Sequence, residues 1–337
     1  MKSILALLFC LPFISAWSQQ PQFRVDTVSL PDKIRYYNNQ FSSLYIYGEK
    51  LFIMSESRLQ DSAEAKLYAI KLTDLDRKRA DTLYNLPFKK YTIYNLAILR
   101  NKMAAAGQQY EGLEAMVIHS GSVYFSVETT TPSSDCYLIK GALNDTAVLM
   151  DTSVLMPIPK PTTANGSHIY NAGFEALLKR KNQLYAFFEF NYFPSGNFVY
   201  ALDSRLQNNS RIRSLPVNNL PFRITDITHT AGNHFTAINY FFNGEGDDTV
   251  YRTPDSDVAN AKHIKDEKGY NSYCRLIDVA FKGDRFTWKP LWEFPQAYRG
   301  YNWEGIAAYK GGYFIINDKY TPRRPYRSTL LYLKKIK

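Results

Sequence analysis

The chain has 337 residues, a formal net charge of +10, 21% charged residues and 15% aromatic residues, but only 3 cysteines. This composition excludes a disordered polyelectrolyte, a small fold held together by disulfides and a zinc module with cysteine ligands. The length allows two domains, but repeat folds longer than 250 residues often form one unit, so the domain count depends on periodicity.

The N-terminal segment, residues 1–18, is typical of a signal peptide. Lys2 supplies a positive charge, an apolar run extends to Ile14, and Ala16 and Ser18 are small residues suited to a cleavage site. The alternative is a membrane anchor, but the apolar run is shorter than the ~20 residues that a transmembrane helix needs. We expect export to the periplasm or the medium, with no transmembrane segment.

The mature chain, residues 19–337, is predicted to form a single domain. It keeps two cysteines, Cys136 and Cys274, which are far apart in the sequence. They could pair in an oxidising compartment, but free buried thiols are the more common state. The sequence therefore leaves their pairing open.

Short aromatic and β-branched runs, separated by Gly, Asn, Asp and Pro, recur along the mature chain. In order, they are residues 44–47, 51–54, 66–72, 123–127, 184–190, 235–240 and 313–316. Such runs are typical of β-strands bounded by turns. We therefore predict an all-β fold, with one helix over residues 95–106 as an insertion.

A unit of fixed spacing occurs five times within these runs. Its first position, which we call the ring position, follows a large apolar residue and is occupied by Ser42, Glu114, Glu175, Thr225 and Glu304. The seventh residue after it is a turn position. The tenth is always aromatic: Phe52, Tyr124, Tyr185, Phe235 and Phe314. The fourteenth, which we call the second acidic column, is Glu56, Glu128, Glu189, Asn239 and Asp318.

The constant offset of fourteen, with a turn at its midpoint, predicts an antiparallel hairpin. The ring position would then lie opposite the fourteenth residue, and the fourth opposite the tenth, all on the same pleat face.

Successive ring positions are 50 to 79 residues apart, which allows two more strands after each hairpin. This arrangement predicts a β-propeller of five four-stranded blades. The last blade lacks a fourth strand, and residues 22–30 are expected to supply it and close the ring. A sixth unit at Arg275 and Lys289 is the alternative. The predicted third strands are residues 66–72, 136–143, 197–203, 275–281 and 328–334.

The first strand of each propeller blade lines the central channel, so the ring positions should meet at one mouth. Three carboxylates and two hydroxyls this close would raise one another's pKa unless a cation neutralised them. Calcium suits such a site because it takes 6–8 oxygen ligands in flexible geometry. The second acidic column is expected to orient these ligands from behind. The alternative is that acids at strand ends face solvent or accept backbone N–H groups.

The hairpin motifs resemble two known families. Leu113-Glu114-Ala115-Met116, Phe174-Glu175-Ala176-Leu177 and Asn302-Trp303-Glu304-Gly305-Ile306-Ala307 resemble the blade motif of phytase-like propellers, exported bacterial proteins with esterase-like activity. The ring order Ser, Glu, Glu, hydroxyl, Glu is similar to the five-bladed calcium-activated nucleotidases, or apyrases, whose channel holds calcium through Ser and Glu residues. The resemblance covers the hairpins but not the loops between them.

This resemblance implies a calcium-dependent hydrolase. Thr225 replaces a Ser of the apyrase pattern and keeps an oxygen ligand. The Gly-Gly-Leu-Gly-Lys-Glu-Trp type of loop expected in apyrases is missing, because Glu128 is followed by Thr129-Thr130-Thr131-Pro132. The departure weakens the case for nucleotide hydrolysis and leaves the expected metal ligands in place.

Three arginines are expected to open onto the same mouth, namely Arg299, Arg323 and Arg324. Their guanidinium groups suit a phosphate or a carboxylate, although pairing with nearby acids is an equal alternative. The five histidines follow no zinc spacing, and no nucleophile motif is present. Two function classes follow: a calcium-dependent hydrolase of an anionic small molecule, or a non-catalytic envelope propeller that binds glycan or protein. We expect a monomer that binds no nucleic acid.

Overall fold

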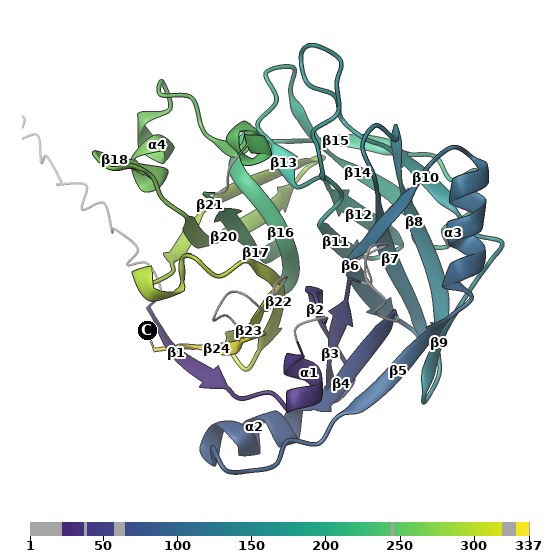
Figure 1. Ribbon diagram of the computed structural model, residues 1–337, viewed down its shortest axis with the longest axis vertical. Helices are drawn as coiled ribbons and strands as arrows, with labels where there is room; N and C mark the ends of the chain where they lie inside the picture. The colour runs from purple at the N-terminus through teal and green to yellow at the C-terminus, as the bar shows by residue number, and fades with distance from the viewer. Residues whose placement is uncertain (1–21, 37–38, 57–64, 244–245, 319–327, 337) are drawn as a thin grey trace, which may run out of the picture.

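The computed structural model describes residues 22–36, 39–56, 65–243, 246–318 and 328–336. Its strands form five antiparallel blades around a central axis, as predicted (Figure 1). Each innermost strand contacts the innermost strands of both neighbouring blades, so the ring is closed. The five innermost strands are β2 (Phe41–Tyr47), β6 (Tyr110–His119), β11 (Ala176–Arg180), β16 (Leu220–Ala231) and β22 (Trp303–Tyr309).

The outer strands complete each blade in chain order. Blade 1 adds β3 (Lys50–Ser55), β4 (Lys66–Lys71) and β5 (Lys89–Tyr94). Blade 2 adds β7 (Ser122–Thr129), β8 (Asp135–Leu143), β9 (Ala147–Met150) and β10 (Met156–Pro159), the last two both pairing with β8. Blade 3 adds β12 (Gln183–Phe187), β14 (Asn197–Asp203) and β15 (Arg213–Val217). Blade 4 adds β17 (His234–Phe241), β20 (Tyr273–Lys282) and β21 (Arg285–Glu293).

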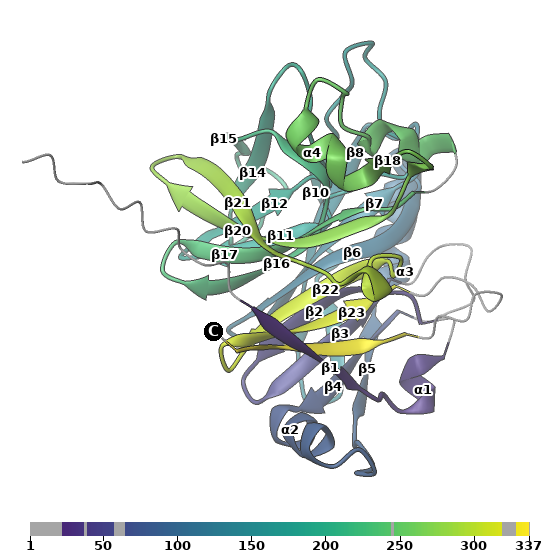
Figure 2. The ribbon, with the colours of Figure 1, turned by 90° about the vertical axis from the view of Figure 1, so that its left-hand side faces the viewer.

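Blade 5 is closed by the two ends of the described chain. It consists of β22, β23 (Gly312–Asn317), β24 (Leu330–Lys335) and β1 (Phe23–Val28), and β1 pairs with β24 from Phe23 opposite Lys335 to Val28 opposite Leu330. Figure 2 shows the purple β1 beside the yellow C-terminal strands. The prediction that the N-terminal segment completes the last blade is confirmed.

The predicted third strands are β4, β8, β14, β20 and β24, and the predicted helix is α3 (Leu96–Ala105). Arg275 and Lys289 belong to β20 and β21, the outer pair of blade 4, so the described strands form no sixth blade. Adjacent blades also join through their outer strands, because β5 pairs with β9 and β15 with β21 in parallel.

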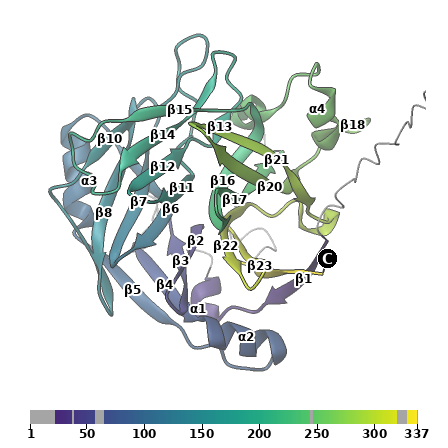
Figure 3. The same ribbon diagram turned by 180° about the vertical axis from the view of Figure 1, so that it is seen from behind.

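The remaining elements connect or extend the blades. They are α1 (Asp32–Arg35), α2 (Leu72–Ala80), β13 (Phe190–Asn191), η1 (Gly246–Tyr251), α4 (Val258–Ile264), β18 (Lys265–Asp266), β19 (Gly269–Tyr270) and η2 (Gln296–Tyr298). Helices α2 and α3 lie on the outside of the ring (Figure 3). Within the described ranges, no helix has both the length and the apolar character needed to cross a membrane.

The predicted hairpin register is wrong by one residue in four blades. In blade 1, Tyr45 rather than Ile46 lies opposite Phe52, and blades 2, 3 and 5 follow the same pattern. The turn has two residues, such as Lys310 and Gly311, both with positive φ. The numbers of two residues that lie opposite each other beside such a turn therefore differ by an odd number, whereas the prediction had an even difference. Only blade 4 has the predicted pairing of the fourth and tenth residues, His229 opposite Phe235, and even there Ile224 rather than Thr225 lies opposite Asn239.

The register changes once more at the ring position in four of the blades, as it does at a β-bulge. In blades 1, 2, 4 and 5 the register changes at or beside the ring residue, for example between Trp303 and Gly305. A bulge adds one residue to a strand and re-aims the side chains beside it. In these four blades the ring residue has no direct partner across the hairpin, and the preceding residue pairs instead, as Trp303 does with Asn317.

Apolar side chains form a separate core between each pair of adjacent blades. The aromatic tenth residue of every unit is buried in one of these five cores. Phe52 lies between blades 1 and 2, for example, whereas Phe235 of blade 4 packs toward blade 3. Each such ring contributes on the order of 1.5–3 kcal/mol of burial free energy, which joins the blades into a rigid frame for the channel mouth.

Candidate functional site

A small cavity of about 70 Å³ lies at the channel mouth where the innermost strands begin. A water molecule occupies roughly 30 Å³ of liquid, so the space suits an ion with a few waters better than a sugar ring. Among the described residues, seven carboxylates and one cation line it. The lining acids are Glu56, Glu114, Glu128, Glu175, Glu189, Glu304 and Asp318, and the cation is Arg223.

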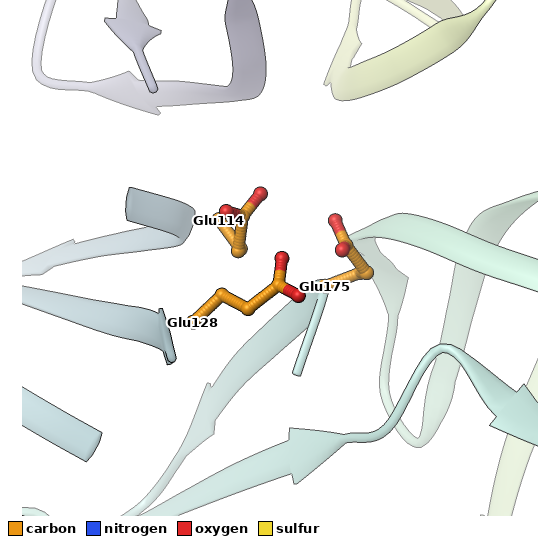
Figure 4. Close-up of side chains that lie close together, drawn as sticks. All are labelled: Glu114, Glu128 and Glu175. Atoms are coloured by element: carbon orange, nitrogen blue, oxygen red, sulfur yellow. The ribbon is translucent and has the colours of Figure 1, made fainter. Parts of the chain in front are cut away.

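Three of these acids form a tight cluster (Figure 4). Glu114, Glu128 and Glu175 each place a carboxylate oxygen within 4.8 Å of the others, and all three side chains are buried. Glu114 lies on β6, Glu128 on β7, and Glu175 directly precedes β11. The cluster therefore bridges blades 2 and 3.

Two glycines make room for this cluster. A Cβ atom at Gly112 would lie 2.7 Å from Oε1 of Glu114 and 3.0 Å from Cγ of Glu56. A Cβ atom at Gly173 would lie 3.2 Å from Cβ of Glu128. Both glycines stand two residues before a ring position, so blades 2 and 3 leave backbone space that the carboxylates fill.

The acids at the mouth are hard to ionise together. Burial raises the pKa of Glu175 well above its usual value, and the charges of Glu189 and Glu304 raise it further. Burial also raises the pKa of Glu304, with Asp318 as the strongest neighbouring charge. The direction of these shifts reflects the cost of crowding negative charge in a site shielded from water, a cost that a bound cation would offset.

The two ring hydroxyls serve as links between blades. Ser42 donates to the carbonyl oxygen of Leu113 at 2.8 Å, and Thr225 donates to that of Trp303 at 2.7 Å. Each acceptor directly precedes the ring glutamate of the next blade, so these bonds fix where that glutamate starts. Ser42 also lines the cavity, whereas Thr225 does not.

The second acidic column divides in the same way. Glu56, Glu128, Glu189 and Asp318 line the cavity, but Asn239 does not. The Asn239 amide donates to the carbonyl oxygens of Pro221 and Arg223, and its Oδ1 accepts from Nε of Arg275 at 2.7 Å. Asn239 is therefore a backbone clamp within blade 4.

Of the three arginines expected at the mouth, Arg299 is not among the residues that line the cavity. Its Nη2 lies 3.5 Å from Oε2 of Glu293, and its Nε donates to the carbonyl oxygen of Phe294. Arg323 and Arg324 lie outside the described residues. The cation that does line the cavity is Arg223, two residues before the ring position of blade 4.

Sequence reasoning also missed Asp226, a buried carboxylate next to Thr225. Its side chain accepts from the backbone N–H groups of Ile306 at 2.9 Å and Leu44 at 3.3 Å, linking blade 4 to blades 5 and 1. Burial raises its pKa, and the backbone donors oppose that shift. The signal was present in the sequence, because the same position is small in the other blades: Ser43, Ala115, Ala176 and Gly305.

Cys136 and Cys274 are buried and unpaired. Cys136 belongs to the core between blades 2 and 3, and Cys274 to the core between blades 4 and 5. Burial raises the pKa of the Cys136 thiol to about 12, so this thiol is a core residue without nucleophilic character.

No protein-family model matches the sequence, and no curated protein matches it. Solved structures do resemble the fold. A GH43 β-xylosidase/α-arabinofuranosidase from a compost microbial metagenome, in complex with xylotriose and in a calcium-free form, aligns with a TM-score of 0.50 and 7% identity over 92% of this chain and 94% of that chain. At this identity the likeness shows the fold alone.

Two further structures have similar coverage. A GH43_1 enzyme from Xanthomonas citri aligns with a TM-score of 0.49 and 9% identity over 91% of this chain and 90% of that chain. An exo-1,5-α-L-arabinanase from a bovine ruminal metagenomic library aligns with a TM-score of 0.49 and 11% identity over 88% and 94%. The strand arrangement itself makes the chain a five-bladed β-propeller, and its function has to be argued from the acidic mouth.

Proposed function

We propose that the channel mouth binds a calcium ion and that the protein is an exported calcium-dependent hydrolase of an anionic small molecule, a phosphate ester or another ester. The main observation behind this proposal is the buried cluster of Glu114, Glu128 and Glu175, which each place a carboxylate oxygen within 4.8 Å of the others. The resemblance to phytase-like propellers and apyrases supports the same reaction class. Export rests on the signal-peptide pattern of residues 1–18.

The donor set fits calcium. The cluster offers oxygen atoms alone, with neither the imidazole nor the thiolate that zinc and copper favour. Three carboxylates, the nearby Glu304 and waters can supply six to eight oxygens in irregular geometry. The glycine-made space at Gly112 and Gly173 lets the acids approach without a clash.

A bound calcium ion would polarise a substrate oxygen and lower the pKa of a bound water. The protein's own residues would do the rest. Glu304, Glu189 and Asp318 lie in the same cavity and can accept a proton from an attacking water, while Arg223 adds a positive charge for the substrate.

A second candidate is an ion-independent glycosidase. Its supporting observation is the raised pKa of Glu175 and Glu304, since a buried protonated carboxyl is what a glycoside general acid requires. The GH43 β-xylosidase/α-arabinofuranosidase of similar fold is in complex with xylotriose, so xylosides and arabinosides belong among the test substrates.

One experiment separates these candidates. The mature protein would be assayed with p-nitrophenyl phosphate, acetate, xyloside and arabinofuranoside, and with a nucleoside triphosphate, in calcium or in chelator. Phosphate or ester turnover that chelator abolishes while the fold persists supports the proposal. Glycoside turnover that survives chelator supports the second candidate.

A third outcome points to the non-catalytic envelope propeller. In that case chelator lowers only the melting temperature and no substrate is turned over, because an ion bound to the native state alone stabilises by mass action. Glu49→Gln removes one exposed carboxylate in the hairpin turn between β2 and β3, so it is the matched control for the Glu→Gln variants of the channel mouth described in the Discussion.

A further inference from the structure

Blade 4 differs from the other blades at two positions of the repeat. Two residues before the ring position, the other blades carry Gln40, Gly112, Gly173 and Asn302, whereas blade 4 carries Arg223. Fourteen residues after it, the other blades carry an acid that lines the cavity, whereas blade 4 carries Asn239. Blade 4 thus replaces a carboxylate at the mouth with a guanidinium group.

The Arg223 side chain is fixed by two contacts from different elements. Its guanidinium carbon lies 4.0 Å from the centre of the Tyr251 ring, and its Nε lies 3.5 Å from Oε2 of Glu189. Tyr251, at the end of η1, donates its hydroxyl to Oε1 of the same Glu189 at 2.7 Å. Stacking on a ring sets the plane of the guanidinium group, and that plane decides which oxyanions it can bind.

The backbone at Arg223 is held by a buried relay. The Asn239 amide donates to the carbonyl oxygens of Pro221 at 2.7 Å and Arg223 at 3.0 Å, and Oδ1 of Asn239 accepts from Nε of Arg275. Arg275 is only 2% exposed, and its Nη1 donates to Oδ1 of Asn260 in α4. The segment between β17 and β20, which contains η1 and α4, therefore contacts Arg223 directly through Tyr251 and indirectly through Arg275.

An anion needs this arrangement to enter the mouth. Seven carboxylates produce a strongly negative potential that repels phosphates and carboxylates. A cation among the acids of blades 2 and 3 lowers this barrier, and a guanidinium group beside it supplies directional N–H donors.

We infer that Arg223 binds the anionic group of the substrate beside the proposed cation, and that Asn239 and Arg275 are positioning residues for it. The inference rests on the proposed calcium site. It assigns to Arg223 the preference of that site for an anionic substrate. Phosphate and carboxylate share the required oxyanion chemistry, and Tyr251 fixes the plane in which either is bound.

The test uses the mature protein saturated with calcium, with phenyl phosphate and phenylacetate as probes. Calorimetry gives two dissociation constants for each variant, one for calcium and one for the anion. Arg223→Gln should weaken binding of the favoured anion about tenfold or more, because charge-assisted hydrogen bonds are lost, while calcium binding stays equal or tighter. Arg223→Lys should fall between, and Arg205→Gln, at the exposed outer edge of blade 3, should match the parent protein.

Asn239→Asp tests the relay. The new carboxylate can still accept from Arg275 but cannot donate to the carbonyls of Pro221 and Arg223, so the melting temperature should fall and anion binding by the folded variant should weaken as well. A merely structural role for Asn239 would change the melting temperature and leave the anion constant as it was.

The failures are distinguishable. A protein that binds no calcium overturns the proposed function. Calcium binding together with unchanged anion affinity in Arg223→Gln, or with no binding of either probe to the parent protein, overturns this inference and leaves the calcium site standing.

Discussion

The two sides of the channel mouth use one hairpin unit for opposite charges. On the side of blades 2 and 3, Gly112 and Gly173 leave space into which Glu114 and Glu128 fold. On the side of blade 4, the position equivalent to those glycines is Arg223, and the carboxylate of the second column is an amide. The difference teaches that the fold fixes where side chains converge, while two columns of the repeat decide what converges there.

The largest expected effect comes from removing a charge on the side of blades 2 and 3. Glu175→Gln should weaken calcium binding about 100-fold or more, since it replaces a charged ligand of the cluster with a neutral one. Glu304→Gln should weaken it less, because Glu304 lies outside the three-residue cluster. Calorimetric titration measures both, and an unchanged constant in Glu175→Gln contradicts the site.

The glycine contrast predicts a selective defect. Gly112→Ala places a methyl group 2.7 Å from Oε1 of Glu114, the flexible end of a side chain, so the carboxylate moves and the fold persists. We expect about tenfold weaker calcium binding with little change in melting temperature. Gly300→Ala is the control, because its Cβ would meet no atom within 4 Å. A large loss of stability in Gly112→Ala would show that the space is structural.

The crowded acids predict how stability depends on pH. The pKa of Glu175 and of Glu304 lies above the value of 4.5 usual for an exposed glutamate. The native state therefore holds protons that the unfolded chain has lost, and stability in chelator should fall as pH rises above about 4.5. Saturating calcium should flatten this fall, by a few degrees in melting temperature at neutral pH. A melting curve in chelator that rises with pH would contradict the assignment.

The smallest effect is expected outside the cavity. Arg299 pairs with Glu293, so Arg299→Gln should change calcium and anion constants by no more than about twofold. A tenfold loss of anion affinity in this variant would show that the anion binds beside η2, at Arg299, rather than at Arg223.

The fold was largely predictable because its repeat is carried by spacing. Ring positions, turn residues and aromatic columns located all five blades, and the leftover segment at the start located β1. The hairpin register was not predictable. A turn of two residues and a turn centred on one residue shift the pairing by a single position, and the composition of the turn does not distinguish them. The bulges at residues such as Ser42 and Glu304 have no distinct composition either.

The mouth was predictable only where it follows the repeat. The convergence of Glu114, Glu175 and Glu304 follows from their shared position, whereas their role as ligands stays a prediction. Tyr251 comes from an insertion without periodicity, and nothing in the sequence places it near Glu189. Arg223 stands in a column that is Gly or amide elsewhere, so comparing the blades at that column would have found it.

The pairing of β1 with β24 also bears on how the molecule is made. The first strand of the ring has no partner until the last has been synthesised, because Phe23 waits for Lys335 and Val28 for Leu330. Contacts between such distant residues form late and slow the final step of folding. Until β24 has been made, β1 is an edge strand without its partner and can pair with another chain, so the growing chain is open to aggregation over this interval.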